Sequence, residues 1–324
     1  MKVLILSVCD WTNLGYEIGR CLNATGHEAR VYIAQPHRFQ YQPSGLPSPG
    51  RSELKELMHD WADAIIAKDE DILYTPQGLE WPLDKTFPFH GGTAFRIQGQ
   101  EMLKQELQAF PGIFILSDLG FHPLASHPKI HVVRTPIDID RWRTYSFDKD
   151  AFLNKSDDTI RVLHSPSDRQ VKGTQTIETT LKSLDGKVVP RIVTGMEHWR
   201  VMAHLSVCNL HIGAVFQIPH TAYPAGSWHM WGVNTLEAMS MGKLAVNSYD
   251  PQPLELLGID PKDCPVIEAR PVNLKDKLEA VIDHGKPWVL EQGERCHQFV
   301  KKYYNDSIVS QDYLKAFQEI TSCV

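Results

Sequence analysis

Apolar runs that alternate with amphipathic segments constrain the fold of this chain more than any other feature of its sequence. Residues 3–8 form a nearly continuous apolar run, residues 13–25 have helical spacing that ends at Gly26, and residues 29–33 are a second, mostly apolar run. A strand, a helix and a strand in this order open a doubly wound parallel sheet. The sequence therefore predicts an α/β protein.

The same alternation resumes after a first interruption at residues 35–51. Residues 35–51 are rich in Pro, Gly, Ser and aromatic residues, which predicts a long surface loop. Further strands are expected at 71–74, 86–89, 113–116, 130–133, 160–164, 191–194, 210–215 and 244–247. Further helices are expected at 52–68, 94–108, 174–182, 199–205, 234–241, 274–284, 288–303 and 307–321.

The length of the chain favours two domains, because 324 residues exceed the usual size of a single hydrophobic core. Residues 136–145 break the regular pattern, and we expect a hinge between two α/β domains there. The turn after the first predicted strand, residues 10–16, contains a single glycine, Gly15. The GxGxxG fingerprint is therefore absent from this turn, which argues against a nicotinamide dinucleotide site.

Composition argues against several classes of protein. The formal net charge of -6, with no Lys/Arg-rich run, argues against nucleic-acid binding that is driven mainly by electrostatic attraction. The 6 cysteines form no CxxC pair, which argues against a zinc knuckle or a disulfide framework and favours a cytoplasmic location. The apolar start is too short for a signal peptide, and no run of about 18 apolar residues predicts a membrane-spanning helix. Peripheral contact at the inner face of a membrane stays open.

A glycine turn that leads into a helix and then into a buried strand, residues 231–246, is the first candidate site. A helix that begins on such a turn offers unpaired backbone N–H groups to an anion, and Glu237 lies one turn inside it. The segment therefore suits a nucleoside diphosphate. Asn234 followed three residues later by Glu237 also resembles a capping box, which only satisfies its own helix.

Other candidates follow predicted strands. Arg169 and Lys172 lie in the loop after residues 160–164, where two cations could neutralise a diphosphate, although a solvated basic loop has the same composition. His90 ends another predicted strand and is either a packed histidine or a catalytic one. His229 precedes the glycine turn, and the neighbouring Trp228 and Trp231 are either a stacking platform or core.

Several of these segments occur in the order seen in GT-B glycosyltransferases, and the chain resembles family 4 of that group over nearly its full length. They are the first strand with its turn, residues 136–140, the loop that ends in Lys172-Gly173-Thr174, and residues 232–239 followed by Gly242-Lys243. The resemblance implies two Rossmann-like domains facing a central cleft. The acceptor domain would span 1–138, completed by a C-terminal helix at 307–324 that packs back on it, and the nucleotide-sugar domain would span 139–306.

The resemblance also implies roles for particular residues. Arg169 and Lys172 would bind the donor diphosphate, and His90 would lie near the transferred sugar as a third catalytic residue. Glu237 would hold the ribose hydroxyls, and Gly15 would let the amino-terminal loop approach the donor. Further donor contacts are expected from His229, Gly232, Val233, Asn234 and Thr235. The resemblance implies no metal ion and no cofactor besides the sugar nucleotide.

The sequence departs from the family at one position. Family members carry two glutamates with seven residues between them, and this chain keeps the second as Glu237 but has His229 at the first. That first glutamate contacts the transferred sugar in the family. A histidine can still hydrogen-bond a sugar hydroxyl, but the family role does not carry over to it.

The function expected from these residues is transfer of a sugar from a nucleoside-diphosphate sugar to an acceptor hydroxyl, with retention and without a metal ion. The acceptor expected is a glycan or glycolipid intermediate, ahead of a nucleic-acid base. Two alternatives stay open: a nucleotide-sugar epimerase or sugar phosphorylase on the same scaffold, and a catalytically weakened glycan-binding protein. His229 makes the last of these credible.

Overall fold

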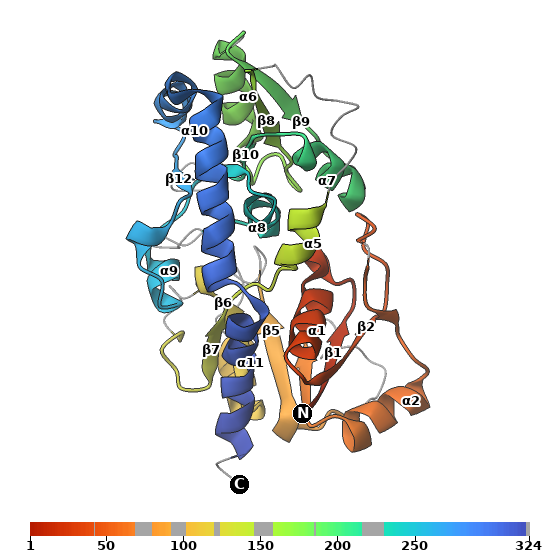
Figure 1. The fold of residues 1–324 in the computed structure, drawn as a ribbon. Helices are drawn as coiled ribbons and strands as arrows, with labels where there is room; N and C mark the ends of the chain where they lie inside the picture. The colour runs from red at the N-terminus through yellow and green to blue at the C-terminus, as the bar shows by residue number, and fades with distance from the viewer. Residues whose placement is uncertain are drawn as a thin grey trace. The chain divides into compact units, whose positions relative to one another are not determined.

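The computed structural model describes residues 1–41, 43–68, 80–91, 102–119, 124–145, 158–184, 186–215 and 230–321. These residues divide into two compact units. The first unit contains the described residues of 1–136 and of 304–321, and the second contains those of 137–215 and 230–303. Each unit is built around one sheet flanked by helices (Figure 1). The α/β fold expected from the sequence is confirmed.

The first unit holds a parallel sheet with the strand order β3-β2-β1-β4-β5-β6-β7. Its central strands are fully buried because apolar side chains cover both faces, as parallel sheets require. The strands are β1 (Lys2–Ser7), β2 (Glu28–Ile33), β3 (Leu46–Pro47), β4 (Ala64–Ala67), β5 (Thr86–His90), β6 (Ile113–Leu116) and β7 (Ile130–Val133).

Two helices of this unit lie near the chain start. The first is α1 (Leu14–Ala24), which follows a 3-10 turn at Trp11–Asn13 and packs on β2. The packing is close, because a Cβ on Gly19 of α1 would lie 2.3 Å from Val31 Cγ2. The second is α2 (Arg51–Glu56), which continues into a π turn at Leu57–Trp61. Between α2 and the end of β7 this unit also has short 3-10 turns at Leu83–Lys85 and Ser117–Leu119 and a helical stretch at 102–109.

The helix expected at 52–68 is wrong beyond residue 61. The π turn ends it when the Ala62 N–H donates to the Leu57 carbonyl at 3.0 Å, and β4 follows as a central strand. Lys85 Nζ donates to the carbonyls of His59 and Ala62, at 3.0 and 2.7 Å, and so satisfies the exposed end of the turn. No glycine or proline separates the helix from the strand, so the pattern gave no stop signal. The strand expected at 71–74 lies outside the described residues.

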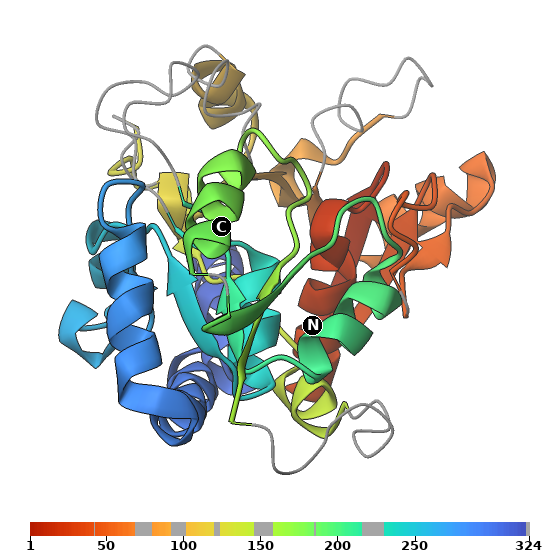
Figure 2. The same cartoon turned by 90° about the horizontal axis from the view of Figure 1, so that it is seen from above.

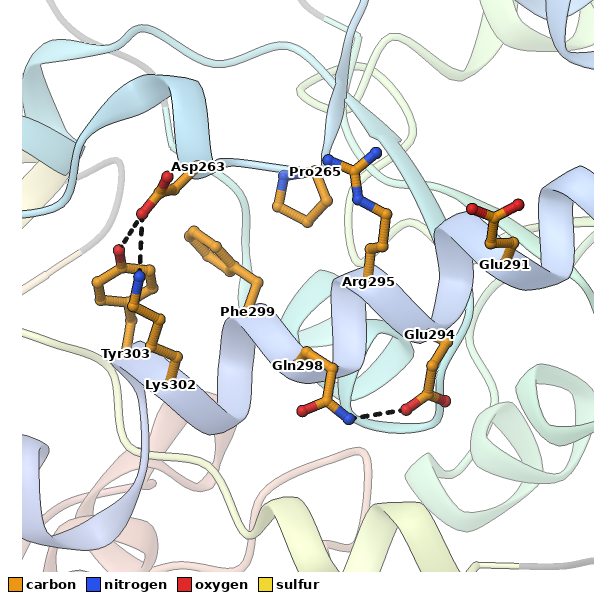
Figure 3. A pocket seen from close by; sticks show the side chains of 9 residues that line it. All are labelled: Asp263, Pro265, Glu291, Glu294, Arg295, Gln298, Phe299, Lys302 and Tyr303. Carbon is orange, nitrogen blue, oxygen red and sulfur yellow. Dashed lines mark hydrogen bonds and ion pairs between the residues drawn. The ribbon is translucent and has the colours of Figure 1, made fainter.

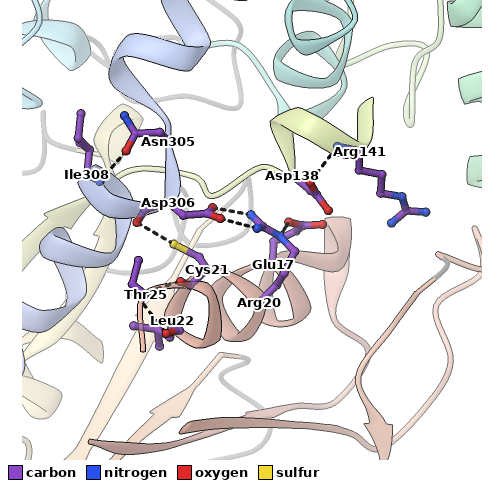
Figure 4. Close-up of polar contacts among 10 residues, drawn as sticks. All are labelled: Glu17, Arg20, Cys21, Leu22, Thr25, Asp138, Arg141, Asn305, Asp306 and Ile308. Atoms are coloured by element: carbon purple, nitrogen blue, oxygen red, sulfur yellow. Dashed lines mark hydrogen bonds and ion pairs between the residues drawn. The ribbon is translucent and has the colours of Figure 1, made fainter. Parts of the chain in front are cut away.

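The last helix, α11 (Asp306–Thr321), packs back on the first unit as expected. Arg20 of α1 holds Asp306 with two hydrogen bonds, at 2.7 and 2.8 Å, and Arg20 also contacts Glu17 (Figure 4). Arg134, after β7, pairs with Asp312 at 2.7 Å. Two neighbouring elements thus fix the register of this helix on the sheet.

The second unit holds a smaller parallel sheet with the strand order β12-β11-β10-β8-β9. Its strands are β8 (Ile160–His164), β9 (Val188–Ile192), β10 (Leu210–Ile212), β11 (Leu244–Asn247) and β12 (Ile267–Glu268). Its helices are α5 (Ile139–Thr144), α6 (Thr174–Ser183), α7 (His198–Ser206), α8 (Val233–Ser240), α9 (Gln252–Leu256) and α10 (Leu274–Tyr303). The helix α10 packs beside α8 and β11 (Figure 2).

The second unit differs from the expectation in detail. The segment expected as a hinge contains the helix α5, whose N-cap Asp138 accepts from the Arg141 N–H at 3.0 Å. Strand β9 begins three residues earlier than expected, at Val188, and α9 and β12 were not expected at all. The helices expected at 274–284 and 288–303 are both present as the two halves of α10, which meet at Gly285, where the φ of 78° is not helical. No helix among the described residues has the length and apolar character needed to cross a membrane.

Candidate functional site

The sheet of the second unit reverses its strand order between β8 and β10. Strand β8 pairs with β9 on one side and with β10 on the other, so the loops at the carboxyl ends of β8 and β10 leave in opposite directions. Open α/β sheets bind their ligands at such a switch point. The loop that carries Arg169 and Lys172 starts there, directly after His164.

Gly173 fixes Lys172 at the switch point. It has a left-handed φ of 69° and caps α6, and a Cβ there would lie 2.0 Å from the Val215 carbonyl oxygen. The Val215 N–H in turn donates to the Lys172 carbonyl at 3.2 Å. Only glycine has room in this position, and the contact ties the loop after β8 to the end of β10.

The same contact region includes the start of α8. Gly232 is the N-cap residue with extended backbone, and no side chain caps the helix. Lys172 Nζ lies 3.6 Å from the position that a Cβ on Gly232 would occupy. The structure therefore brings the Lys172 ammonium to a helix N-terminus whose first N–H groups have no partner within the helix.

The capping box considered for Asn234 and Glu237 does not form. The helix begins two residues earlier than that arrangement requires, with Val233 as its first residue, and the Asn234 amide donates to the Ser165 carbonyl at 3.2 Å. This bond joins α8 to the loop after β8. Thr235 is fully buried, and its Oγ1 has no hydrogen-bond partner among the described residues.

Arg169 lies in the same loop but contacts a different element. Its Nη2 is 2.5 Å from Glu178 Oε1 of α6, and 51% of its side chain is exposed. Its charge still reaches the switch point, because both Lys172 and Arg169 oppose protonation of His164. Lys172 thus lies directly at the N-terminus of α8, whereas Arg169 lies in the same loop but pairs with Glu178 of α6.

Glu237 is buried, with 5% of its side chain exposed. Its Oε1 accepts a hydrogen bond from His198 Nε2 at 2.7 Å, and His198 is the first residue of α7. No motif singled out His198, although its position after a strand, at the edge of the sheet where ligands bind, is a signal that could have found it. The carboxylate expected to hold a ribose therefore has a partner from another helix.

Two further histidines lie buried in this unit. Burial lowers the pKa of His164 to about 4, although the hydrogen bond to the Ile212 carbonyl acts in the opposite direction and raises it. Its Nδ1 lies 2.9 Å from the Ile212 carbonyl and must donate to it, so Nε2 accepts from Thr174 Oγ1 at 2.9 Å. Burial also lowers the pKa of His211 to about 3, and neither ring nitrogen of His211 has a partner among the described residues.

These two histidines predict that stability falls as the solution is acidified. Their folded pKa values of about 4 and about 3 lie below the ordinary 6.5, so the unfolded chain binds more protons below pH 6.5. Stabilisation from the neutral imidazoles is present above pH 6.5 and is lost as the pH falls toward 4. The free energy of unfolding, measured with urea, is expected to be lower at pH 5 than at pH 7 by about 3–4 kcal/mol from this pair alone.

The replacement His211→Leu is the control for this prediction. Its stability is expected to depend on pH about half as steeply between pH 6.5 and 4, because one of the two depressed groups is gone. An unchanged pH dependence in that variant would show that His211 does not carry the effect.

The first unit has its own switch point, between β1 and β4. Asp10 follows β1, Lys68 follows β4, and Lys68 Nζ lies 3.2 Å from Asp10 Oδ1 with both side chains buried. The Gly15 N–H donates to the same Asp10 oxygen at 2.7 Å. Gly15, expected to let the loop approach a donor, is thus engaged by a carboxylate of its own chain. Lys68 was missed because the sequence placed it in a helix.

The turn that holds Asp10 is strained. Asp10, Thr12 and Asn13 have φ of 37°, 63° and 58°, in the left-handed region that a β-branched threonine rarely adopts. Such strain persists where surrounding contacts enforce it, and it concentrates at functional sites. Here the Asn13 amide donates to the Pro43 carbonyl at 3.0 Å, which joins the turn to the loop after β2.

This turn and the loop after β2 enclose a cavity of about 480 Å³ at the carboxyl edge of the first sheet. The loop contributes an aromatic pair, His37 and Tyr41, with ring centroids 5.2 Å apart. Polar side chains line the rest of the cavity, among them Asp10, Asn13, Arg38, Gln40 and Ser44. The mixture of aromatic rings with donors and acceptors suits a hydroxylated ligand.

His90 ends β5 but is buried rather than open to solvent. Its Nε2 lies 2.5 Å from Glu106 Oε2, and the two side chains are 2% and 1% exposed. This is the packed arrangement that the sequence left open. His229 and Trp228 lie outside the described residues. Trp231 is core, since it is 6% exposed and stacks edge-on against Tyr249 and Phe299.

A second hollow in the second unit, of about 360 Å³, lies between the 3-10 turn Pro261–Asp263 and α10 (Figure 3). It lies before β12, on the side away from the carboxyl ends of the strands. Its charges satisfy one another: Asp263 holds Lys302 at 3.1 Å and the Tyr303 hydroxyl. We therefore place the candidate site at the switch point, where Lys172 and α8 meet, and not in this hollow.

Comparison with solved structures gives the same fold over the whole chain. A glycosyltransferase from Rickettsia africae matches 99% of this chain and 98% of its own at 11% identity, with a TM-score of 0.61. HepE from Anabaena, in complex with UDP-glucose, matches 100% of both chains at 12% identity, with a TM-score of 0.66. The catalytic domain of starch synthase IV from Arabidopsis thaliana, bound to ADP and acarbose, matches 99% of both at 10% identity, with a TM-score of 0.65.

The chain has the GT-B glycosyltransferase fold. No protein-family model and no curated protein sequence matches it. Within the GT-B fold, the switch point described above belongs to the second unit, whose described residues lie in 137–215 and 230–303. Across the described ranges, no group of three or more His, Cys, Asp or Glu side chains is arranged to hold a metal ion.

Proposed function

We propose that this protein is a glycosyltransferase that moves a sugar from a nucleoside-diphosphate sugar to an acceptor hydroxyl. One observation carries the proposal: the Lys172 ammonium lies beside Gly232 at the uncapped N-terminus of α8, at the switch point of the second sheet. A cation and helix N–H groups that converge on one point form a site for a diphosphate. The GT-B fold and the nucleotide ligands of HepE and starch synthase IV support this assignment.

The chemistry needs charge stabilisation more than acid–base groups. The bond between the sugar anomeric carbon and the diphosphate oxygen breaks, the acceptor oxygen bonds to that carbon, and the proton of the acceptor hydroxyl passes to the leaving diphosphate oxygen. Negative charge develops on the leaving diphosphate, where Lys172, the α8 N–H groups and Arg169 at the margin stabilise it. We expect transfer with retention and without a metal ion, as in the family that the sequence resembles.

The nucleoside end of the donor lies farther along α8 in this proposal. Four residues separate Val233 from Glu237, which corresponds to about 6 Å along the helix axis. A diphosphate at the N-terminus therefore leaves the ribose near the Glu237 carboxylate. Val233 and Asn234 present backbone N–H groups to the phosphates, whereas the Thr235 N–H donates to the Gly232 carbonyl at 3.0 Å and closes the first turn behind them. His229 remains our candidate for contact with the sugar.

The first unit supplies the acceptor in this proposal. Its cavity at the carboxyl ends of β1 and β2 joins aromatic rings to hydrogen-bonding side chains, which suits a glycan or glycolipid intermediate. Gly15 shapes the turn at this cavity through its bond to Asp10. His90 stays a weaker candidate for contact with the sugar, because its side chain is buried in a pair with Glu106 that would have to open first.

The test is a panel of nucleotide sugars incubated with the protein and a mixed set of glycan and glycolipid acceptors. We expect release of nucleoside diphosphate together with a glycosylated acceptor, unaffected by EDTA. A free epimerised sugar would identify an epimerase, and formation of a sugar 1-phosphate from inorganic phosphate would identify a phosphorylase. Donor binding without turnover on any acceptor would identify a glycan-binding protein that has lost activity.

A further inference from the structure

We infer that His198 positions the Glu237 carboxylate for one ribose hydroxyl of the nucleotide and so sets the preference of the site for ribonucleotides. This inference rests on the proposed function, because it assigns a residue to the donor site. The two residues lie 39 positions apart in the chain, since His198 begins α7 and Glu237 lies in α8.

The bond between the two side chains is short and shielded from water. His198 Nε2 donates to Glu237 Oε1 at 2.7 Å, and 11% and 5% of the two side chains are exposed. A hydrogen bond to a charged acceptor is stronger than a neutral one, and shielding from solvent strengthens it further. The carboxylate is therefore held in one rotamer before any ligand arrives.

A third element fixes the histidine ring itself. His198 packs edge-on against Trp142 of α5, with ring centroids 5.5 Å apart and planes at 81°. Trp142 is 3% exposed, and α5 packs against α8. Three helices thus converge on this pair, so the ring cannot turn away from Glu237 without disturbing the core around Trp142.

The arrangement leaves one carboxylate oxygen for a ligand. Oε1 is engaged by His198, whereas Oε2 has no hydrogen-bond partner among the described residues. Oε2 is not among the buried side-chain atoms that lack a partner, so it reaches solvent and is open to a ligand that brings a donor. Given the diphosphate position at the α8 N-terminus, the donor that reaches Oε2 is a ribose hydroxyl.

The competing explanation is that the pair only joins α7 to α8. Two substitutions separate the possibilities. His198→Phe keeps an aromatic ring against Trp142 but removes the N–H donor, whereas His198→Gln keeps an N–H donor that reaches the same oxygen. A structural role predicts loss of stability that does not depend on the ligand, and a positioning role predicts a loss specific to the ribose.

The experiment is calorimetric titration of UDP and ADP, each paired with its 2′,3′-dideoxy analogue, into the wild type and both variants. We expect the wild type to bind a ribonucleoside diphosphate more tightly than its dideoxy analogue. His198→Phe is expected to weaken ribonucleotide binding about 10- to 100-fold, with the dideoxy analogue changed by less than about threefold, and His198→Gln is expected to restore most of the loss.

Glu237→Gln provides a second route should His198→Phe fold poorly. It is expected to remove the same ribose preference, and the double variant is expected to lose no more than either single variant. Equal weakening of both ligands, or no weakening of either, would overturn the role of His198. A wild type that binds these diphosphates without distinguishing the dideoxy forms would overturn this inference alone, whereas one that binds none of them would overturn the proposed function as well.

Discussion

Replacing Lys172 with alanine is expected to lower kcat by about 10²- to 10³-fold, the usual cost of removing one group that stabilises a developing negative charge. Lys172 Nζ lies beside Gly232 at the start of α8, so the variant loses the cation nearest to the proposed diphosphate. The fold is expected to lose less than about 1 kcal/mol, because the backbone contacts of Lys172 do not depend on its side chain. Steady-state release of nucleoside diphosphate measures the change in kcat, and urea unfolding measures the change in stability.

Lys182→Ala is the matched control for this prediction. Lys182 is an exposed lysine in the last turn of α6, at the end of the helix away from the switch point. It removes the same charge from the same unit and is expected to leave kcat within about twofold of the wild type. Equal kcat values in Lys172→Ala and Lys182→Ala would contradict the proposed role of Lys172, because the location of the lost charge would then have no effect.

Gly173→Ala is expected to destabilise the second unit by about 4 kcal/mol. Two costs add: alanine is strained at the φ of 69°, and its Cβ would lie 2.0 Å from the Val215 carbonyl oxygen. The backbone must shift to relieve the clash, and the shift moves the neighbouring Lys172. Urea unfolding measures the loss of stability, and turnover of the folded fraction is expected to fall as well.

Gly258→Ala separates the two costs. Gly258 has the same φ of 69°, but no atom lies within 4 Å of the position of its Cβ. Only backbone strain remains, so this variant is expected to lose about 1–2 kcal/mol. A Gly173→Ala variant no less stable than Gly258→Ala would mean that the contact between the loop after β8 and the end of β10 is not tight.

The periodic segments of this fold could be predicted from sequence because each carries its own signal. The strand at residues 244–247 and the helix after Gly232 were placed almost to the residue, since an apolar run or a glycine turn bounds each of them. Residues 62–68 were misread as helix because the helical spacing runs into the apolar strand β4 without a break. That error also hid Lys68 as the partner of Asp10.

The site was only partly accessible from sequence for a physical reason. Local pattern shows that Lys172 and Gly232 each follow a strand, but their approach depends on the strand order of the sheet, which brings the ends of β8 and β10 together. The pair of His198 with Glu237 joins two helices 39 residues apart in the chain. No local spacing encodes such a pair, since the intervening strand β10 sets the distance between the helices.

Calorimetric titration of nucleoside diphosphates into the wild type, Lys172→Ala and Lys182→Ala tests whether a diphosphate binds at Lys172 and the start of α8. We expect saturable binding of at least one nucleoside diphosphate, weakened by at least about tenfold in Lys172→Ala and unchanged in Lys182→Ala. A wild type that binds no nucleoside diphosphate, or a Lys172→Ala variant that binds as tightly as the wild type, would contradict the assignment of the diphosphate to Lys172 and the start of α8.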